Sequence, residues 1–235
     1  MVTLFDEMVR LFAVLNPPLD EGRGRILQFV SAQHGEGVST IAREFARVAA
    51  LQSSGDVLLL DLNTQAEGQY EHFKNVELRD HSLTVGEAVE IGLDPAPLWR
   101  IVSETELQDQ PRLPRGDLMS FHRIGSTRLL VSRFHRQYLS DGQTAQVTSR
   151  PDFWDHVRSA VNFTIVDSPA SAQSVDGLAI STAMDAVVLV VEAESTRVPV
   201  IEDLRDRLRA RGAHVAGVVF NKRSFYIPEP IYRLL

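Results

Sequence analysis

The residues best suited to chemistry lie in one stretch, residues 25–40, which reads RILQFVSAQHGEGVST. An apolar run is followed by a loop with two glycines and then by a helical pattern, IAREFARVAAL. This order is typical of a phosphate-binding loop, because backbone N–H groups and the positive end of the following helix converge on phosphate oxygens. The residues predicted to bind a nucleotide here are Gly35, Glu36, Gly37, Val38, Ser39 and Thr40.

One position of this loop departs from the phosphate-loop pattern. The spacing from Ala32 to Gly37 and Ser39 fits G/A-x-x-x-x-G-K-[ST], but Val38 stands where the pattern has lysine. A lysine at this position neutralises charge on the β and γ phosphates during transfer. Valine supplies no cation, whereas the backbone and Mg²⁺ could still hold ATP or ADP. The sequence therefore allows nucleotide binding with weak turnover or none, and leaves open whether ATP is still bound.

Three polar side chains are expected beside the loop at strand ends. The runs VLLLD and FTIVD end in Asp61 and Asp167, and HVAGVVFN ends in Asn221. We predict that both aspartates act in catalysis and hold Mg²⁺ together with Ser39, because hydroxyl and carboxylate oxygens suit that ion. Asn221 is predicted to read the adenine edge through its amide. The alternative is that these side chains only cap the turns that follow their strands.

Composition excludes several other classes of protein. The net charge of −7 argues against a broad nucleic-acid-binding face, and the absence of cysteine rules out disulfides and Cys-ligated metals. With 44% hydrophobic residues but no apolar run near the ~20 needed to cross a bilayer, we expect a soluble protein without direct membrane insertion. The seven histidines show no metal-ligand spacing.

Alternating apolar runs and helical patterns predict the fold class. Buried strands are expected at 26–30, 57–61, 127–132, 163–167, 185–193 and 214–221, with helices between most of them. Residues 84–91, TVGEAVEI, are expected to form a helix, and the segment 76–146 is otherwise hard to interpret. This pattern predicts an α/β protein with a doubly wound, mostly parallel sheet, whose ligands bind at the carboxyl ends of the strands.

The chain is expected to have one main domain and an N-terminal helix. Apolar residues at helical spacing occupy residues 3–16, and Pro17-Pro18 ends the pattern. We therefore divide the chain into residues 1–18, a helix that could mediate oligomerisation, and residues 25–235, a P-loop domain.

These motifs together resemble those of the bacterial tyrosine kinases and the related capsular-polysaccharide ATPases, within the wider group that includes division-site and partition ATPases. SAQHGEGVST resembles their Walker A motif, VLLLDLN their Walker A′ and FTIVDSPA their Walker B. The N-terminal helix carries Glu7 and Arg10 at the spacing of the family's E-x-x-R-x-x-R motif. The resemblance covers most of the chain.

The resemblance implies a place in capsule or exopolysaccharide production. Family members are cytoplasmic, bind ATP and Mg²⁺, assemble into rings, and are activated by a membrane-embedded chain-length regulator that recruits them to the membrane. By this resemblance Gly35, Gly37, Ser39 and Thr40 would bind phosphate and Mg²⁺, while Asp61 and Asp167 would take the A′ and B roles.

Four departures from the family weaken its phosphoryl-transfer chemistry, and a fifth alters the oligomerisation motif of the N-terminal helix. Val38 replaces the loop lysine, and Gln33 stands where partition ATPases have their signature lysine. Asn63 replaces the second A′ aspartate and no basic residue follows it closely. The tail offers only Tyr226 and Tyr232 instead of a tyrosine cluster, and Ala13 replaces the last arginine of the helix motif. The sequence therefore predicts a degenerate, regulatory or scaffolding member of the family.

Two other functions remain open from sequence alone. One is an active kinase or ATPase in which a cation from elsewhere, such as a neighbouring subunit, replaces Val38. The other is a positioning ATPase of the division-site or partition kind, which the acidic composition makes the weaker alternative.

Overall fold

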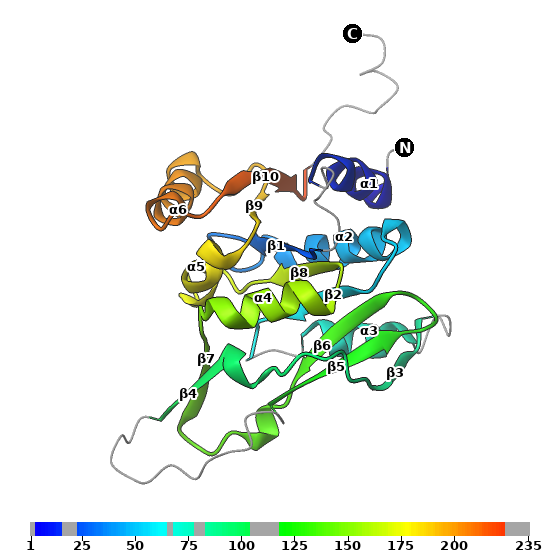
Figure 1. Ribbon diagram of the computed structural model, residues 1–235. Helices are drawn as coiled ribbons and strands as arrows, with labels where there is room; N and C mark the ends of the chain where they lie inside the picture. The colour runs from blue at the N-terminus through cyan, green and yellow to red at the C-terminus, as the bar shows by residue number, and fades with distance from the viewer. Residues whose placement is uncertain (1–2, 16–22, 65–67, 78–82, 104–117, 224–235) are drawn as a thin grey trace.

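The structure is a computed structural model that describes residues 3–15, 23–64, 68–77, 83–103 and 118–223 (Figure 1). Its main element is an eight-stranded sheet in the order β10-β9-β1-β8-β2-β6-β5-β3, and a separate ribbon pairs β4 with β7. The strands are β1 (Arg25–Val30), β2 (Val57–Asp61), β3 (Val85–Ala88), β4 (Trp99–Ser103), β5 (Met119–Ile124), β6 (Leu129–Phe134), β7 (Gln143–Val147), β8 (Phe163–Asp167), β9 (Ala186–Glu192) and β10 (Val215–Asn221). The helices are α1 (Leu4–Leu15), α2 (Val38–Gln52), α3 (Gln69–Glu77), α4 (Pro151–Ala160), α5 (Asp176–Ile180) and α6 (Val198–Ala210), with short 3₁₀ turns at Ala96–Leu98, Arg136–Tyr138 and Ser181–Ala183.

The sheet is mixed but mostly parallel, as predicted. β10, β9, β1, β8, β2 and β6 pair in parallel, and β5 pairs antiparallel with both β6 and β3. Each of the parallel strands β1, β2, β8 and β9 is buried along nearly its whole length. Strands covered on both faces are apolar along nearly their whole length, so these runs could be predicted as strands from the sequence.

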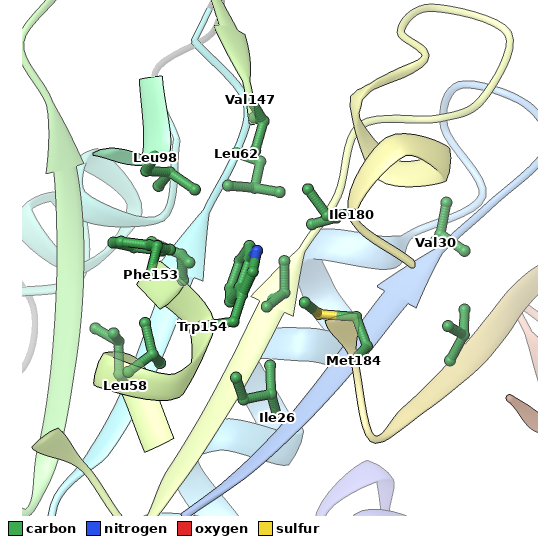
Figure 2. Packing of buried hydrophobic residues seen from close by; sticks show 14 of the residues in the cluster. Ile26, Val30, Leu58, Leu62, Leu98, Val147, Phe153, Trp154, Ile180 and Met184 are labelled. Atoms are coloured by element: carbon green, nitrogen blue, oxygen red, sulfur yellow. The ribbon is translucent and has the colours of Figure 1, made fainter. Parts of the chain in front are cut away.

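Helices cover both faces of the sheet and divide the core in two (Figure 1). One cluster joins α1, α2 and α3 to the sheet, and the other joins α4, α5, α6 and the β4–β7 ribbon to it. In the second cluster the Trp154 ring lies beside Phe153, with centroids 5.1 Å apart, and faces Ile180 and Met184 (Figure 2). No helix in the described ranges is long and apolar enough to cross a bilayer.

The N-terminal helix α1 packs against the main domain. Its Met8 and Phe12 are buried, and the Phe12 ring lies 5.8 Å from that of Phe45 on α2 and 5.7 Å from that of Phe163 on β8. Glu7 and Arg10 of the family motif are exposed. The helix therefore contributes to the core through one face, and its role in oligomerisation stays a prediction.

The helix predicted over residues 84–91 is wrong. Val85–Ala88 forms the edge strand β3, which pairs antiparallel with β5. The apolar spacing around Val85 and Val89 suits a helix, but pairing with β5 decides the conformation, and short edge strands carry weak sequence signals. Gly86 sits so close to β5 that an added Cβ would lie 3.3 Å from the carbonyl oxygen of Arg123. The strands β4, β5 and β7 also lie in the segment that the sequence left undefined.

Truncation of Phe12 should destabilise the protein strongly. Removing a buried aromatic ring typically lowers the free energy of unfolding by about 3–5 kcal/mol, so Phe12→Ala should shift the urea midpoint well below that of wild type. Phe5→Ala is the matched control, because Phe5 lies on the same helix but is 44% exposed. Equal midpoints for the two variants would show that α1 does not pack on the core in solution.

Candidate functional site

The predicted site residues come from strand ends that the sheet brings together. β1 lies between β9 and β8, and β2 is the next strand beyond β8. In the register of the β2–β8 pair, Asp61 is directly opposite Asp167, and Phe29 of β1 is the other partner of Asp167. The loop that follows β1 therefore starts beside both carboxylates, at the carboxyl edge where open α/β sheets bind ligands.

Two glycines give the loop its shape. Gly35 and Gly37 have φ angles of 86° and 91°, in the left-handed region that glycine adopts without strain. A Cβ on Gly37 would also lie 2.1 Å from Nδ2 of Asn221. That amide donates a hydrogen bond to the Glu36 carbonyl at 2.9 Å. Asn221 thus supports the loop directly, and its predicted contact with adenine stays a prediction.

The Glu36 side chain points inward and braces the loop against the end of β9. It is 1% exposed, and its carboxylate accepts hydrogen bonds from the backbone N–H of Gln33 at 2.8 Å and of Glu192 at 3.3 Å. The Thr196 hydroxyl donates to the same carboxylate. The part of Glu36 predicted to meet a nucleotide is therefore its backbone, since its side chain is engaged inside the protein.

Lys222 also holds the loop in place. Its Nζ donates to the Gly35 carbonyl at 2.6 Å and forms an ion pair with Glu192 at 3.0 Å. Its backbone has φ 56°, an uncommon conformation for a residue other than glycine. The sequence gave no signal for the roles of Lys222, Thr196 or Glu192 in holding the loop.

Val38 is a core residue. It is 7% exposed and belongs to the apolar cluster between α1, α2 and the sheet, whereas Ser39 and Thr40 are exposed at the start of α2. The position that carries a cation in the phosphate-loop pattern therefore contributes packing in this chain. The glycine loop and the two hydroxyls remain in place around it.

The two carboxylates are buried side by side. Asp61 and Asp167 are 7% and 3% exposed. Asp61 accepts hydrogen bonds from the backbone N–H of Asn63 at 2.9 Å and of Gln69 at 2.7 Å, which anchors the turn after β2 and the start of α3. Burial raises the pKa of Asp61. Burial, and then the neighbouring charge of Asp61, raise the pKa of Asp167 to about 7, although hydrogen bonds from Gln69 and Ser39 oppose this shift.

Gln69 and Arg43 complete the site, and sequence reasoning missed both. The Gln69 side-chain N–H₂ donates to Asp167 Oδ2 at 2.6 Å and to the Ser39 carbonyl at 2.9 Å. Arg43 Nη1 donates to Gln69 Oε1 at 2.8 Å. Arg43 could have been suspected, because it follows Ser39 by four residues and shares its helix face. Gln69 follows a polar stretch without periodicity, so only the fold reveals it.

Comparisons with known sequences support the family resemblance at a distance. No family model matches the chain. It is 22% identical over 198 residues to the tyrosine-protein kinase CpsD of Streptococcus agalactiae, covering 84% of this chain and 75% of that protein. The same protein from a serotype Ia strain of that species matches at 22% over 200 residues, with 85% and 75% covered.

Solved structures with this fold include several kinase domains. The chimerical protein CapA2B2 superimposes with a TM-score of 0.60 at 19% identity, covering 94% of this chain and 85% of that one. The VpsO kinase domain gives 0.57 at 16% identity with 94% and 93% covered, and the Escherichia coli ETK kinase domain gives 0.54 at 15% with 94% and 78%. These likenesses show the fold, and with the CpsD match they support the resemblance to bacterial tyrosine kinases.

Protonation of Asp167 should make stability depend on pH. Its pKa of about 7 in the folded chain lies above the ordinary value of 3.8, so the folded state keeps a proton that the unfolded state has lost. The contribution of this group to the free energy of unfolding is greatest below pH ~4 and falls as pH rises to ~7. Asp167→Asn removes this titration, and its melting temperature relative to wild type should increase from pH 5 to pH 8.

The matched control is Asp141→Asn, at an exposed loop carboxylate. Thermal melts by circular dichroism at several pH values measure both differences. A constant difference between wild type and Asp167→Asn over this range would contradict the raised pKa.

Proposed function

We propose that this chain, which resembles bacterial tyrosine kinases in fold and sequence, is a tyrosine-kinase-like P-loop protein of capsule or exopolysaccharide biosynthesis. It acts mainly as a regulatory or scaffolding subunit, with weak ATP turnover or none. The observation that carries this proposal is the burial of Val38 in the apolar core at the position of the phosphate-loop lysine. The likeness to CpsD supports the biological setting.

The loss of the lysine affects catalysis more than binding. Phosphoryl transfer depends on positive charge placed on the transferring phosphate, and an apolar side chain supplies none. The backbone cradle does not need that charge, because glycine φ angles and a helix N-terminus create it. Both persist here, at Gly35, Gly37 and the start of α2. ATP or ADP is therefore the proposed ligand, held through backbone N–H groups and the hydroxyls of Ser39 and Thr40.

The braces around the loop support a binding role as well. Glu36, Asn221 and Lys222 fix the loop through the hydrogen bonds described above. A loop that is already held in shape loses little conformational freedom when it binds a ligand. Such a site suits a subunit that senses or carries a nucleotide without consuming it.

The proposed partners are a membrane-embedded chain-length regulator and further copies of this chain. Glu7, Arg10 and Ala13 lie on the exposed side of α1, opposite the face that carries Met8 and Phe12. A motif on the outer side of a packed helix is available for contact with another subunit. With Ala13 in place of the last arginine, this contact is expected to be weak.

An active kinase is the second candidate, and Arg43 is the observation that favours it. Arg43 is a cation within the site and influences both carboxylates. Its guanidinium is hydrogen-bonded to Gln69, however, so it would have to leave that partner to reach a phosphate. Phosphotyrosine detected by mass spectrometry after expression with the membrane partner would establish this alternative.

Nucleotide binding by Val38 variants tests the proposed function. We expect wild type to bind ADP in calorimetric titrations and to hydrolyse ATP no faster than background. Val38→Lys adds a charge-assisted contact worth about 1.5–3 kcal/mol, so it should bind ADP at least about tenfold more tightly. Val38→Met is the matched control, since it adds comparable length to the side chain without charge.

Two results would count against the proposal. ATP hydrolysis by wild type at a rate equal to or above that of Val38→Lys would show that the site is an active enzyme. A failure of both wild type and Val38→Lys to bind ADP would show that the loop no longer accepts a nucleotide.

A further inference from the structure

Gln69 occupies the place that the sequence assigned to Mg²⁺. The side chain is 2% exposed and lies among all three predicted metal ligands. Its side-chain N–H₂ bonds Asp167 Oδ2 and the Ser39 carbonyl, at 2.6 and 2.9 Å, and its backbone N–H bonds Asp61 Oδ2 at 2.7 Å. One residue at the start of α3 thus joins Ser39, Asp61 and Asp167.

The carboxylate oxygens around this position are already used by protein donors. Each oxygen of Asp61 accepts a backbone N–H, from Asn63 and from Gln69. The backbone of Gly68 also lies close to Asp61, because a Cβ added to Gly68 would lie 1.9 Å from Asp61 Oδ2. Mg²⁺ requires oxygen ligands at ~2.0–2.1 Å in near-octahedral geometry. An N–H donor in the same position excludes the ion, because it fills the space and turns its own partial positive charge toward the carboxylate oxygens.

Arg43 supplies the positive charge that a metal ion would bring. Its guanidinium holds Gln69 Oε1 at 2.8 Å and interacts electrostatically with Asp167 and Asp61. Its Nε is buried without a hydrogen-bond partner among the described residues. A half-buried arginine in this position is costly unless it offsets negative charge nearby. The residues present therefore do not fit a divalent cation.

We infer that this chain has replaced the divalent cation at its strand-end carboxylates with its own Gln69 amide and Arg43 guanidinium. A nucleotide on the loop is accordingly bound without Mg²⁺. The second statement rests on the proposed function, whereas the first does not. Ser39, Asp61 and Asp167 were predicted to hold Mg²⁺ from the sequence and the family resemblance. By this inference, the chain has lost that metal site.

Titration of the full chain with Mn²⁺ alone, followed by electron paramagnetic resonance of the free ion, tests the first statement. Wild type should bind no Mn²⁺ at this site. Gln69→Ala removes the side-chain amide that bonds Asp167 but keeps the backbone N–H that bonds Asp61. Because Asp167 loses a hydrogen bond to its charged form, Mn²⁺ affinity should rise at least about tenfold. Gln52→Ala is the matched control, because Gln52 is an exposed glutamine at the end of α2.

Two outcomes would overturn the inference. One is Mn²⁺ binding by wild type that Asp167→Asn abolishes. The other is a folded Gln69→Ala variant that gains no Mn²⁺ affinity, which would show that Gln69 does not exclude the ion. If circular dichroism shows that Gln69→Ala does not fold, Gln69→Asn takes its place, because it keeps the amide but withdraws it from Asp167 by one methylene.

Calorimetric titration with ADP tests the second statement. Wild type should bind ADP with the same affinity, within about threefold, in EDTA and in excess Mg²⁺, since the metal contributes no contact. A tenfold gain with Mg²⁺ would overturn the inference. No ADP binding in either buffer would instead contradict the proposal that the loop binds ATP or ADP. The Mn²⁺ titration would still show whether Asp61 and Asp167 bind a metal ion.

Discussion

The buried pair of carboxylates at the ends of β2 and β8 is the constraint around which the functional edge of this protein is arranged. Parallel pairing puts Asp61 and Asp167 in register, with almost no exposure to water. Two adjacent buried carboxylates are unstable unless donors and positive charge surround them. The start of α3 and the second turn of α2 provide both, through Gln69 and Arg43. The positions of these helices and the chemistry of the site are therefore linked.

The same linkage explains how the phosphate loop can keep its shape after losing its lysine. Loop geometry depends on left-handed glycines and on contacts from Glu36, Asn221 and Lys222, none of which involves residue 38. Val38 instead packs in the cluster that also holds α1. Side-chain identity at this position can change without unfolding the cradle, because backbone geometry and side-chain charge are separate contributions to the site.

Sequence reasoning worked where burial on both faces imposes one type of residue. The strands that become β1, β2, β8 and β9 are continuous apolar runs, so their presence could be predicted. It failed at β3, where the residue pattern of an edge strand suits a helix equally well. The site residues likewise fall into those that the sequence could predict and those that it could not. Asp61 and Asp167 stand at recognisable strand ends, whereas Gln69 belongs to no motif.

By itself, the sequence determined the parallel α/β fold, the glycine loop, the missing lysine and the two strand-end carboxylates, because each depends on local spacing or local burial. Only the tertiary structure decided what surrounds them. Gln69 bonds both Arg43 and Asp167, although it is 98 residues from Asp167 along the chain. The Glu36 side chain turns inward, where its carboxylate accepts hydrogen bonds from the Thr196 hydroxyl and the Glu192 N–H, about 160 residues away along the chain. Hydrogen bonds between distant segments leave no periodic trace in a sequence, because sheet register and helix packing bring the partners together.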